Sequence, residues 1–418
     1  MRICWPNEFP GVYWLDNREE EAVLDVLRNG SMFRYYGLGE PDYPAGTGMP
    51  RHVDAFEAKA QAVYGSEYTL GMNSGTGALI TAMRALDIGV GCEVIVPAFL
   101  WVATVGAVVQ VGAIPVICEI DEAFNLDPVD LVKKITPQTK LIIPIHMAGT
   151  PCDMDAIMEV ADNHGIAVLE DCAQCNGGTF KGKSVGTFGK MGIFSLQLNK
   201  NITSGEGGLL ITDDEQLYLR AFAAHDMGLV RVAGRLATPE DSGLMWGAGR
   251  RMSELCGAVA AVQMDKLKAI TGKMRASKYR MRQLLKAIPG IGLRHIPDED
   301  GDSSVFIIML VDDADVALKM AEKMKADGLK NIHRLADYGL HIYSNIPSLV
   351  KKIPLSSTGE PWQSPENSES IYDYSQGRCA QSDALFARSI ILPIPSCLTV
   401  ELETQAVEII KNALAESR

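Results

Sequence analysis

Short apolar runs alternate with amphipathic stretches through the first half of the chain. The apolar runs, which predict buried strands, lie at residues 68–72, 94–97, 115–119, 141–146, 166–171, 192–197 and 208–212. The stretches with helical spacing lie at residues 53–64, 75–86, 103–112, 128–135 and 154–164. Because buried strands separated by helices are typical of a parallel sheet covered on both faces, the pattern predicts an α/β fold with a large, mostly parallel sheet.

The pattern changes after about residue 265. The elements expected there are a long charged helix at residues 266–287, a strand at 304–311 and helices at 316–328 and 400–416. Residues 355–376 are polar and contain proline and glycine, so we expect a loop or insertion there. We therefore predict a large domain at 54–265, a smaller α+β domain at 266–418, and an N-terminal segment, 1–53, packed near the small domain.

Residues 94–118 form a 25-residue stretch without charge, which is long enough to span a bilayer. Pro97, Gly112 and Pro115 interrupt it, and no cluster of Lys or Arg flanks it. These breaks favour a buried strand, a loop, a helix and a second strand over a membrane span.

The charge and cysteine content narrow the class of protein further. The 418 residues include 39 Lys and Arg against 52 Asp and Glu, a net charge of −13 that argues against a nucleic-acid partner. Nine cysteines, an odd number, occur without an apolar N-terminal signal segment, which predicts reduced thiols in a cytoplasmic protein.

Two motifs in the middle of the chain resemble sites that we do not expect. Residues 177–184 match the phosphate-binding G-x-x-x-x-G-K-S pattern, but the glycine-rich residues that follow predict a strand instead of the required helix. A β-hairpin with a Lys-Gly turn is the better interpretation. Cys172 and Cys175 form one C-x-x-C pair, which cannot complete a four-ligand zinc site, so we expect two small buried thiols and no metal.

Three other elements together indicate a cofactor. The small residues around Gly75 and Thr76, between a strand and a helix, would expose backbone N–H groups to a phosphate. Asp171 ends a buried strand, where open α/β sheets bind ligands, and Lys200 follows another strand in a polar loop. A phosphate cradle, a strand-end carboxylate and a loop lysine are what pyridoxal phosphate requires, with Trp101 available to stack on the cofactor ring.

These elements fall within blocks that resemble the DegT/DnrJ/EryC1/StrS aminotransferases. The blocks are SGTGAL (74–79), GCEVIVPAFLWVAT (91–104), GAIPVICEID (112–121), ITPQTKLIIPIHMAG (135–149), LEDCAQ (169–174), FKGKSVGTFG (180–189) and FSLQLNKNITSGEGG (194–208). The resemblance implies fold type I of the pyridoxal-phosphate enzymes. It also implies a homodimer that transfers an amino group from glutamate or glutamine to a keto-sugar or keto-cyclitol in a ping-pong cycle.

The resemblance implies a role for each matching residue. Lys200 corresponds to the Schiff-base lysine and Asp171 to the partner of the pyridinium nitrogen, and these two are the expected catalytic residues. The other expected cofactor contacts are Gln174 near the phenolic oxygen, Trp101 on the ring, and Gly75, Thr76 and Ser195 on the phosphate.

One departure from the family pattern concerns a contact between subunits. The usual G-x-N-x-R-M-S occurs here as residues 247–253, with Gly249 in place of the asparagine that in relatives reaches the neighbouring subunit's phosphate. Arg250 or Arg251 is the expected substitute.

Residues 32–35 and 374–383 resemble the branch that aminates 3,8-dideoxy-octulosonate sugars, which favours an unactivated, anionic keto-sugar. The expected substrate residues are Arg34, His333, Tyr338 and Arg378.

Three alternatives remain open from the sequence. A sugar dehydratase uses the same fold, but related dehydratases carry histidine where this chain has Lys200. The others are an enzyme resembling the aminohydroxybenzoate synthases of the family and a cofactor-binding regulator without turnover.

Overall fold

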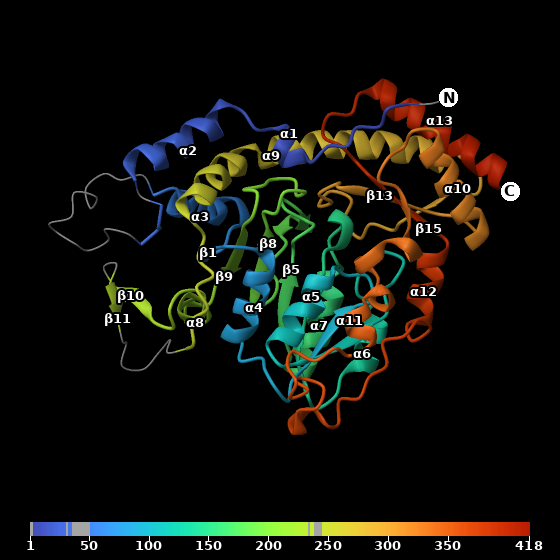
Figure 1. The fold of residues 1–418 in the computed structure, drawn as a ribbon. Helices are drawn as coiled ribbons and strands as arrows, with labels where there is room; N and C mark the ends of the chain where they lie inside the picture. Colours follow the sequence, from blue (N-terminus) through green and yellow to red (C-terminus); the bar gives the residue numbers. More distant parts are fainter. Residues whose placement is uncertain (1–2, 31, 36–50, 233–234, 238–244) are drawn as a thin grey trace.

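A seven-stranded sheet forms the centre of the larger part of the molecule (Figure 1). The computed structural model describes residues 3–30, 32–35, 51–232, 235–237 and 245–418. The strand order is β1 (Tyr68–Met72), β9 (Gly208–Thr212), β8 (Met191–Ser195), β5 (Ala167–Asp171), β4 (Thr139–Ile142), β2 (Glu93–Pro97) and β3 (Ile114–Cys118). Strand β9 is antiparallel to both neighbours and all other pairs are parallel, so the predicted α/β sheet is confirmed.

Helices cover both faces of this sheet, as the apolar runs require. The helices are α3 (His52–Tyr64), α4 (Gly75–Ala85), α5 (Val102–Gln110), α6 (Pro128–Lys134), α7 (Met154–His164), α8 (Glu215–His225) and α9 (Glu254–Lys286). Neighbouring side chains of a strand point to opposite faces. Ile193 of β8 accordingly packs in the core beneath α4 and α5, whereas Phe194 packs in the core beneath α3 and α9.

A smaller antiparallel sheet lies beside the far end of α9 (Figure 1). Its order is β12 (Gly292–Leu293), β13 (Phe306–Leu310), β15 (Ser389–Pro393) and β14 (His333–Arg334). Helices α10 (Ala314–Ala326) and α13 (Val400–Ser417) pack against it through one shared core with α9. Helix α9 runs without a break through the division expected at residue 265, so it belongs to both parts.

The segment between β14 and β15 packs on the large sheet, and its residues 355–376 form the predicted loop, with one 3-10 turn at Pro365–Asn367. It contains α11 (Pro347–Val350), α12 (Ala380–Ala387) and several 3-10 turns. Its Tyr343, Tyr374 and Phe386 belong to the core of the large sheet. A few buried aromatic and amide side chains of this loop, such as Tyr374 and Asn367, provide the contact.

The N-terminal residues lie along α9 (Figure 1). Helices α1 (Pro10–Tyr13) and α2 (Asn17–Asn29) pack on it, and Lys266 of α9 donates to both carboxylate oxygens of Glu19 at 2.6 and 2.7 Å. Ile3 N–H also donates to Asp327 O of the smaller part, at 3.0 Å. Residues 1–2, 31 and 36–50 of the predicted N-terminal segment lie outside the described residues.

Two local predictions are confirmed and one strand is shorter than expected. Residues 177–184 contain the hairpin β6 (Thr179–Phe180) and β7 (Lys183–Ser184), whose Lys-Gly turn has positive φ at both residues. The uncharged stretch forms β2, α5 and β3, and none of the helices in the described part of the chain is long and apolar enough to cross a membrane. Strand β4 ends at Ile142 instead of residue 146, because Pro144 has no N–H for the ladder.

We expect Tyr374→Phe to lower the free energy of unfolding by about 1–3 kcal/mol, because Tyr374 Oη donates to Pro115 O at 2.7 Å and the variant leaves that buried carbonyl without a donor. Urea denaturation followed by tryptophan fluorescence measures this. Tyr13→Phe is the matched control, since the Tyr13 side chain is 62% exposed and its hydroxyl has no hydrogen-bond partner among the described residues. Equal midpoints for the two variants would contradict the packing described here.

Candidate active site

A cavity of about 340 Å³ lies at the carboxyl edge of the large sheet. The lining residues come from the loops after β1, β2, β4, β5 and β8, and from the smaller part of the chain. They are Ser74, Gly75, Thr76, Leu79, Trp101, Ala103, Thr104, Ile145, Asp171, Ala173, Gln174, Ile193, Ser195, Gln197, Asn199, Lys200, Asn201, Glu206, Val305, Phe306, Tyr338 and His341. The position agrees with the rule that open α/β sheets bind ligands outside the carboxyl ends of their strands.

The first turn of α4 forms one end of the cavity. Ser74 caps this helix, and its Oγ accepts from Gly77 N–H at 2.9 Å. The N–H groups of Gly75 and Thr76 precede the intrahelical ladder, so they are available to an anion. A Cβ on Gly75 would lie 2.9 Å from Ser195 Cβ, so only glycine permits this approach of the helix to β8.

Asp171 places a buried carboxylate at the end of β5. Its Oδ1 accepts from Ala173 N–H at 3.1 Å and its Oδ2 accepts from Thr104 Oγ at 2.9 Å. Burial raises the pKa of the Asp171 carboxyl, whereas these hydrogen bonds and the nearby charge of Lys200 oppose the rise. A carboxylate that is only 4% exposed and makes no ion pair with any residue that the structure describes favours a cationic ligand atom.

Lys200 lines the same cavity, in the loop after β8. Burial lowers its pKa to about 8, and the charge of Asp171 limits the fall. Its Nζ has no hydrogen-bond partner among the described residues. A lysine with this pKa is partly neutral at neutral pH, which is the form in which an amine acts as a nucleophile or a base.

Gln174, Trp101 and Ser195 complete the set of predicted cofactor contacts at the cavity. Gln174 Oε1 accepts from Ala148 N–H at 3.1 Å, which leaves its NH₂ group available. Ser195 Oγ accepts from Gln197 N–H at 3.3 Å and keeps its own proton to donate. Trp101 is 43% exposed, with its ring centroid 4.6 Å from that of His341. All seven residues predicted for the cofactor therefore line one cavity.

Only one of the four residues predicted to bind the substrate lines the cavity. Tyr338 lines the cavity, and His333 lies behind it, with its ring 5.0 Å from the Tyr338 ring. Arg34 is only 5% exposed and forms an ion pair with Glu57 at 2.7 Å, so its charge is already used inside the protein. Arg378 pairs with Asp373 at 2.6 Å on the surface. In this chain, then, Arg34, His333 and Arg378 lie outside the cavity.

Sequence reasoning missed three residues that line the cavity. Thr104 is the hydroxyl that bonds Asp171, and its position three residues after Trp101 could have indicated it. His341 lies three residues after Tyr338 and was not predicted as a site residue. Phe306 starts β13 and comes from a strand more than 100 residues beyond Lys200, which no local pattern connects to the site.

The two arginines considered as substitutes at Gly249 differ in their contacts. Arg251 Nη1 lies 2.6 Å from Asp226 Oδ1 in an ion pair. Arg250 has no ion pair among the residues that the structure describes. Neither lines the cavity of its own chain, so a contact of Arg250 with a second subunit stays a prediction.

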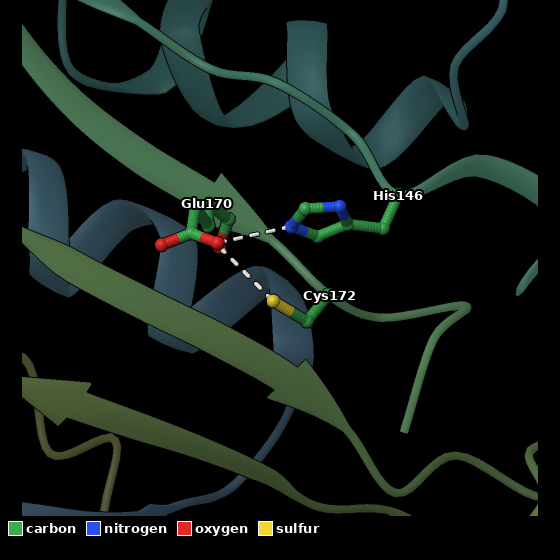
Figure 2. Close-up of side chains that lie close together, drawn as sticks. All are labelled: His146, Glu170 and Cys172. Atoms are coloured by element: carbon green, nitrogen blue, oxygen red, sulfur yellow. Dashed lines mark hydrogen bonds and ion pairs between the residues drawn. The ribbon is translucent and has the colours of Figure 1, made fainter. Parts of the chain in front are cut away.

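His146, Glu170 and Cys172 point toward one another beneath the site (Figure 2). Cys152 N–H donates to His146 Nδ1, so the proton of this imidazole lies on Nε2 and is donated to Glu170 Oε2 at 3.1 Å. Glu170 also accepts from the backbone of the loop at residues 186–189. Cys172 Sγ donates to Glu170 O at 3.9 Å, so the three side chains form a hydrogen-bonded support for the end of β5.

The C-x-x-C thiols are buried and unpaired, as predicted. Cys172 and Cys175 are both 0% exposed and form no disulfide. Burial raises the pKa of each thiol, to about 12 for Cys175, which keeps the sulfur protonated and unreactive.

Residues 47–344 match the DegT/DnrJ/EryC1/StrS aminotransferase family, and the chain belongs to it. It is 33% identical over 284 residues to spore coat polysaccharide biosynthesis protein SpsC of Bacillus subtilis (strain 168), covering 66% of this chain and 72% of that protein. It is 29% identical over 414 residues to 3-amino-5-hydroxybenzoate synthase of Amycolatopsis mediterranei (strain S699), covering 98% of each.

The solved structure of the aminotransferase from Psychrobacter cryohalolentis has a TM-score of 0.79 and 26% identity, over 100% of this chain and 99% of that chain. The fold is therefore that of the type I aminotransferases. The family consists of pyridoxal-phosphate enzymes, mostly sugar aminotransferases that act on keto-sugars with an amino donor, and some members are dehydratases or synthases.

We expect Gly75→Ala to weaken the binding of pyridoxal phosphate at least tenfold, because the added Cβ would meet Ser195 and displace the first turn of α4. A titration of cofactor-free protein, followed by absorbance, measures the dissociation constant. The matched control is Gly106→Ala in α5, where an added Cβ meets nothing within 4 Å. An unchanged dissociation constant for Gly75→Ala would place the phosphate elsewhere.

Proposed function

We propose that this protein is a pyridoxal-phosphate-dependent aminotransferase that moves an amino group from glutamate or glutamine to a keto-sugar or keto-cyclitol. The observation that carries the proposal is the shared cavity of Lys200 and Asp171, beside the start of α4. The Lys200 amine, which has a lowered pKa, is complementary to the aldehyde of pyridoxal phosphate. The buried Asp171 carboxylate, which has no ion pair among the described residues, is complementary to its pyridine nitrogen.

The residues of the cavity fit the cofactor at each of its polar groups. Asp171 would hold the pyridinium nitrogen, since its hydrogen bonds with Ala173 and Thr104 leave it capacity to accept another hydrogen bond. The free NH₂ group of Gln174 would donate to the phenolic oxygen. The phosphate would accept from Ser195 Oγ and from the first N–H groups of α4, without a basic side chain.

Bound pyridoxal phosphate supplies an electron-withdrawing ring next to the amine that is exchanged. Asp171 would keep a proton on the ring nitrogen, which would strengthen that withdrawal. The Lys200 amine, whose pKa is about 8, would accept and return the proton that moves during the exchange near neutral pH. Trp101 holds the plane of the ring, and Phe306 and Tyr338 close the cavity from the smaller part of the chain.

The lysine favours amine transfer over dehydration, because the related dehydratases carry histidine at its position. The match with the 3-amino-5-hydroxybenzoate synthase spans 98% of both chains, so a cyclic ketone is the second candidate acceptor. A regulator without turnover would not require a partly neutral lysine in the cavity. Our proposal also includes a homodimer in the cytoplasm, supported by the family resemblance and by nine unpaired cysteines.

We expect glutamate or glutamine to remove the visible absorbance of the cofactor-loaded protein, because the donor takes the place of Lys200. Lys200→Ala abolishes this response, and a spectrophotometric titration measures both proteins.

The control is Lys183→Ala, which removes an exposed lysine of the β6–β7 hairpin and leaves the response intact. A wild-type protein that takes up pyridoxal phosphate but does not respond to either donor would contradict aminotransfer.

A further inference from the structure

The first turn of α5 lies against the carboxylate of Asp171. Thr104, the third residue of this helix, donates through its Oγ to Asp171 Oδ2 at 2.9 Å. The Thr104 N–H donates to Trp101 O, also at 2.9 Å, which closes the turn. Thr104 is only 1% exposed, and both residues line the cavity. One helical turn therefore carries the aromatic ring expected on the cofactor and a hydroxyl bonded to the expected partner of its nitrogen.

The two oxygens of Asp171 are held by different kinds of group. Oδ1 accepts from the backbone N–H of Ala173 at 3.1 Å. Oδ2 accepts from Thr104, the only side chain that donates to Asp171 among the residues that the structure describes. A backbone N–H and a hydroxyl that donates both favour a charged carboxylate, because its oxygens only accept. Thr104 is thus the one donor to Asp171 that a side-chain substitution removes.

The charge of Asp171 depends on few other groups. Burial raises the pKa of its carboxyl, and the hydrogen bonds from Ala173 and Thr104 oppose the rise, followed by Lys200 and His146. The start of α5 adds the partial positive charge of a helix N-terminus. Lys200 is the residue expected to link to the cofactor, so its own ammonium charge is not available to Asp171 in the loaded protein. The Thr104 hydroxyl acts on Asp171 with and without cofactor.

We propose that Thr104 is a positioning residue that keeps Asp171 ionised, so that a proton shared with a bound ring nitrogen stays on the nitrogen. Without the hydroxyl, Asp171 Oδ2 is a buried oxygen without a donor. The same proton then moves from the nitrogen to the carboxylate, which leaves both groups neutral and forms no other bond. The inference rests on the proposed function and adds a residue that acts through Asp171.

Three variants separate the Thr104 hydroxyl from the shape of the side chain. Thr104→Val removes the hydroxyl and keeps the shape, whereas Thr104→Ser keeps the hydroxyl. Thr104→Ala also lacks the hydroxyl but adds no methyl group beside the carboxylate, so it provides a second test if Thr104→Val does not fold. Thr81→Val is the matched control, because Thr81 is 0% exposed and its Oγ has no hydrogen-bond partner among the described residues.

The position of the proton is measured directly by NMR. Each protein is loaded with pyridoxal phosphate that carries ¹⁵N in its ring, and the chemical shift reports whether this nitrogen is protonated. We expect wild type, Thr104→Ser and Thr81→Val to show the protonated nitrogen. Thr104→Val and Thr104→Ala are expected to shift toward the value of an unprotonated pyridine.

A cofactor analogue distinguishes this role from a loss of packing. 1-Deazapyridoxal phosphate has a C–H group in place of the ring nitrogen, so it offers no proton for Asp171 to share. We expect Thr104→Val to weaken the binding of pyridoxal phosphate about tenfold, the effect of one hydrogen bond to a charged group, and that of the analogue at most twofold. Titrations of cofactor-free protein measure both dissociation constants.

Two results would overturn the inference. One is a wild-type ¹⁵N shift in the variants without the hydroxyl, and the other is an equal loss of affinity for the two cofactors, as a structural role would give. Loss of visible absorbance when glutamate is added to the wild-type protein tests the proposed function separately. A wild type that responds to glutamate, with either overturning result in the variants, would contradict the role of Thr104 alone.

Discussion

The burial of the Asp171 carboxylate is the constraint on which the rest of the site depends. A carboxylate removed from water requires hydrogen bonds and a cation. Thr104 and Ala173 provide the hydrogen bonds, and Lys200 provides a positive charge nearby. The Asp171 backbone is held by the segment after β4, because Asp171 N–H donates to Pro144 O and Asp171 O accepts from His146 N–H. The same arrangement that orients the carboxylate also leaves it ready for a cationic ligand atom.

The support beneath Asp171 explains why a buried histidine and glutamate lie next to the site without taking part in it. Glu170 points to the opposite side of β5 and accepts from three backbone N–H groups and from His146. These bonds tie the end of β5 to the loop at residues 186–189. Because neighbouring side chains of a strand point to opposite faces, the Glu170 carboxylate makes structural hydrogen bonds and the Asp171 carboxylate lies at the cavity.

The smaller part of the chain closes the cavity with groups that carry no charge. Tyr338 and His341 are held by their mutual stacking and by the core that residues 335–387 share with the large sheet. Asp171 and Lys200, on which the proposed cofactor binding rests, line the same cavity.

The features that depend on residues close together in the sequence could be predicted from it. Apolar runs such as those of β5 and β9 predicted strands, and the positions of Gly75, Asp171 and Lys200 relative to strand ends predicted one shared site. Contacts between distant segments could not be predicted in this way. Arg34 resembled a substrate ligand because the sequence did not show that Glu57 already pairs with it. His341 was missed because stacking with Trp101, 240 residues earlier, exists only in the folded chain.

Chemical mapping identifies the lysine that binds the cofactor. The protein is loaded with pyridoxal phosphate, reduced with borohydride to make the link permanent, digested, and analysed by mass spectrometry. The account predicts that the pyridoxyl group is found on the peptide that contains Lys200, and that Lys200→Ala protein carries none. A label on another lysine, or no label on the wild-type protein, would contradict it.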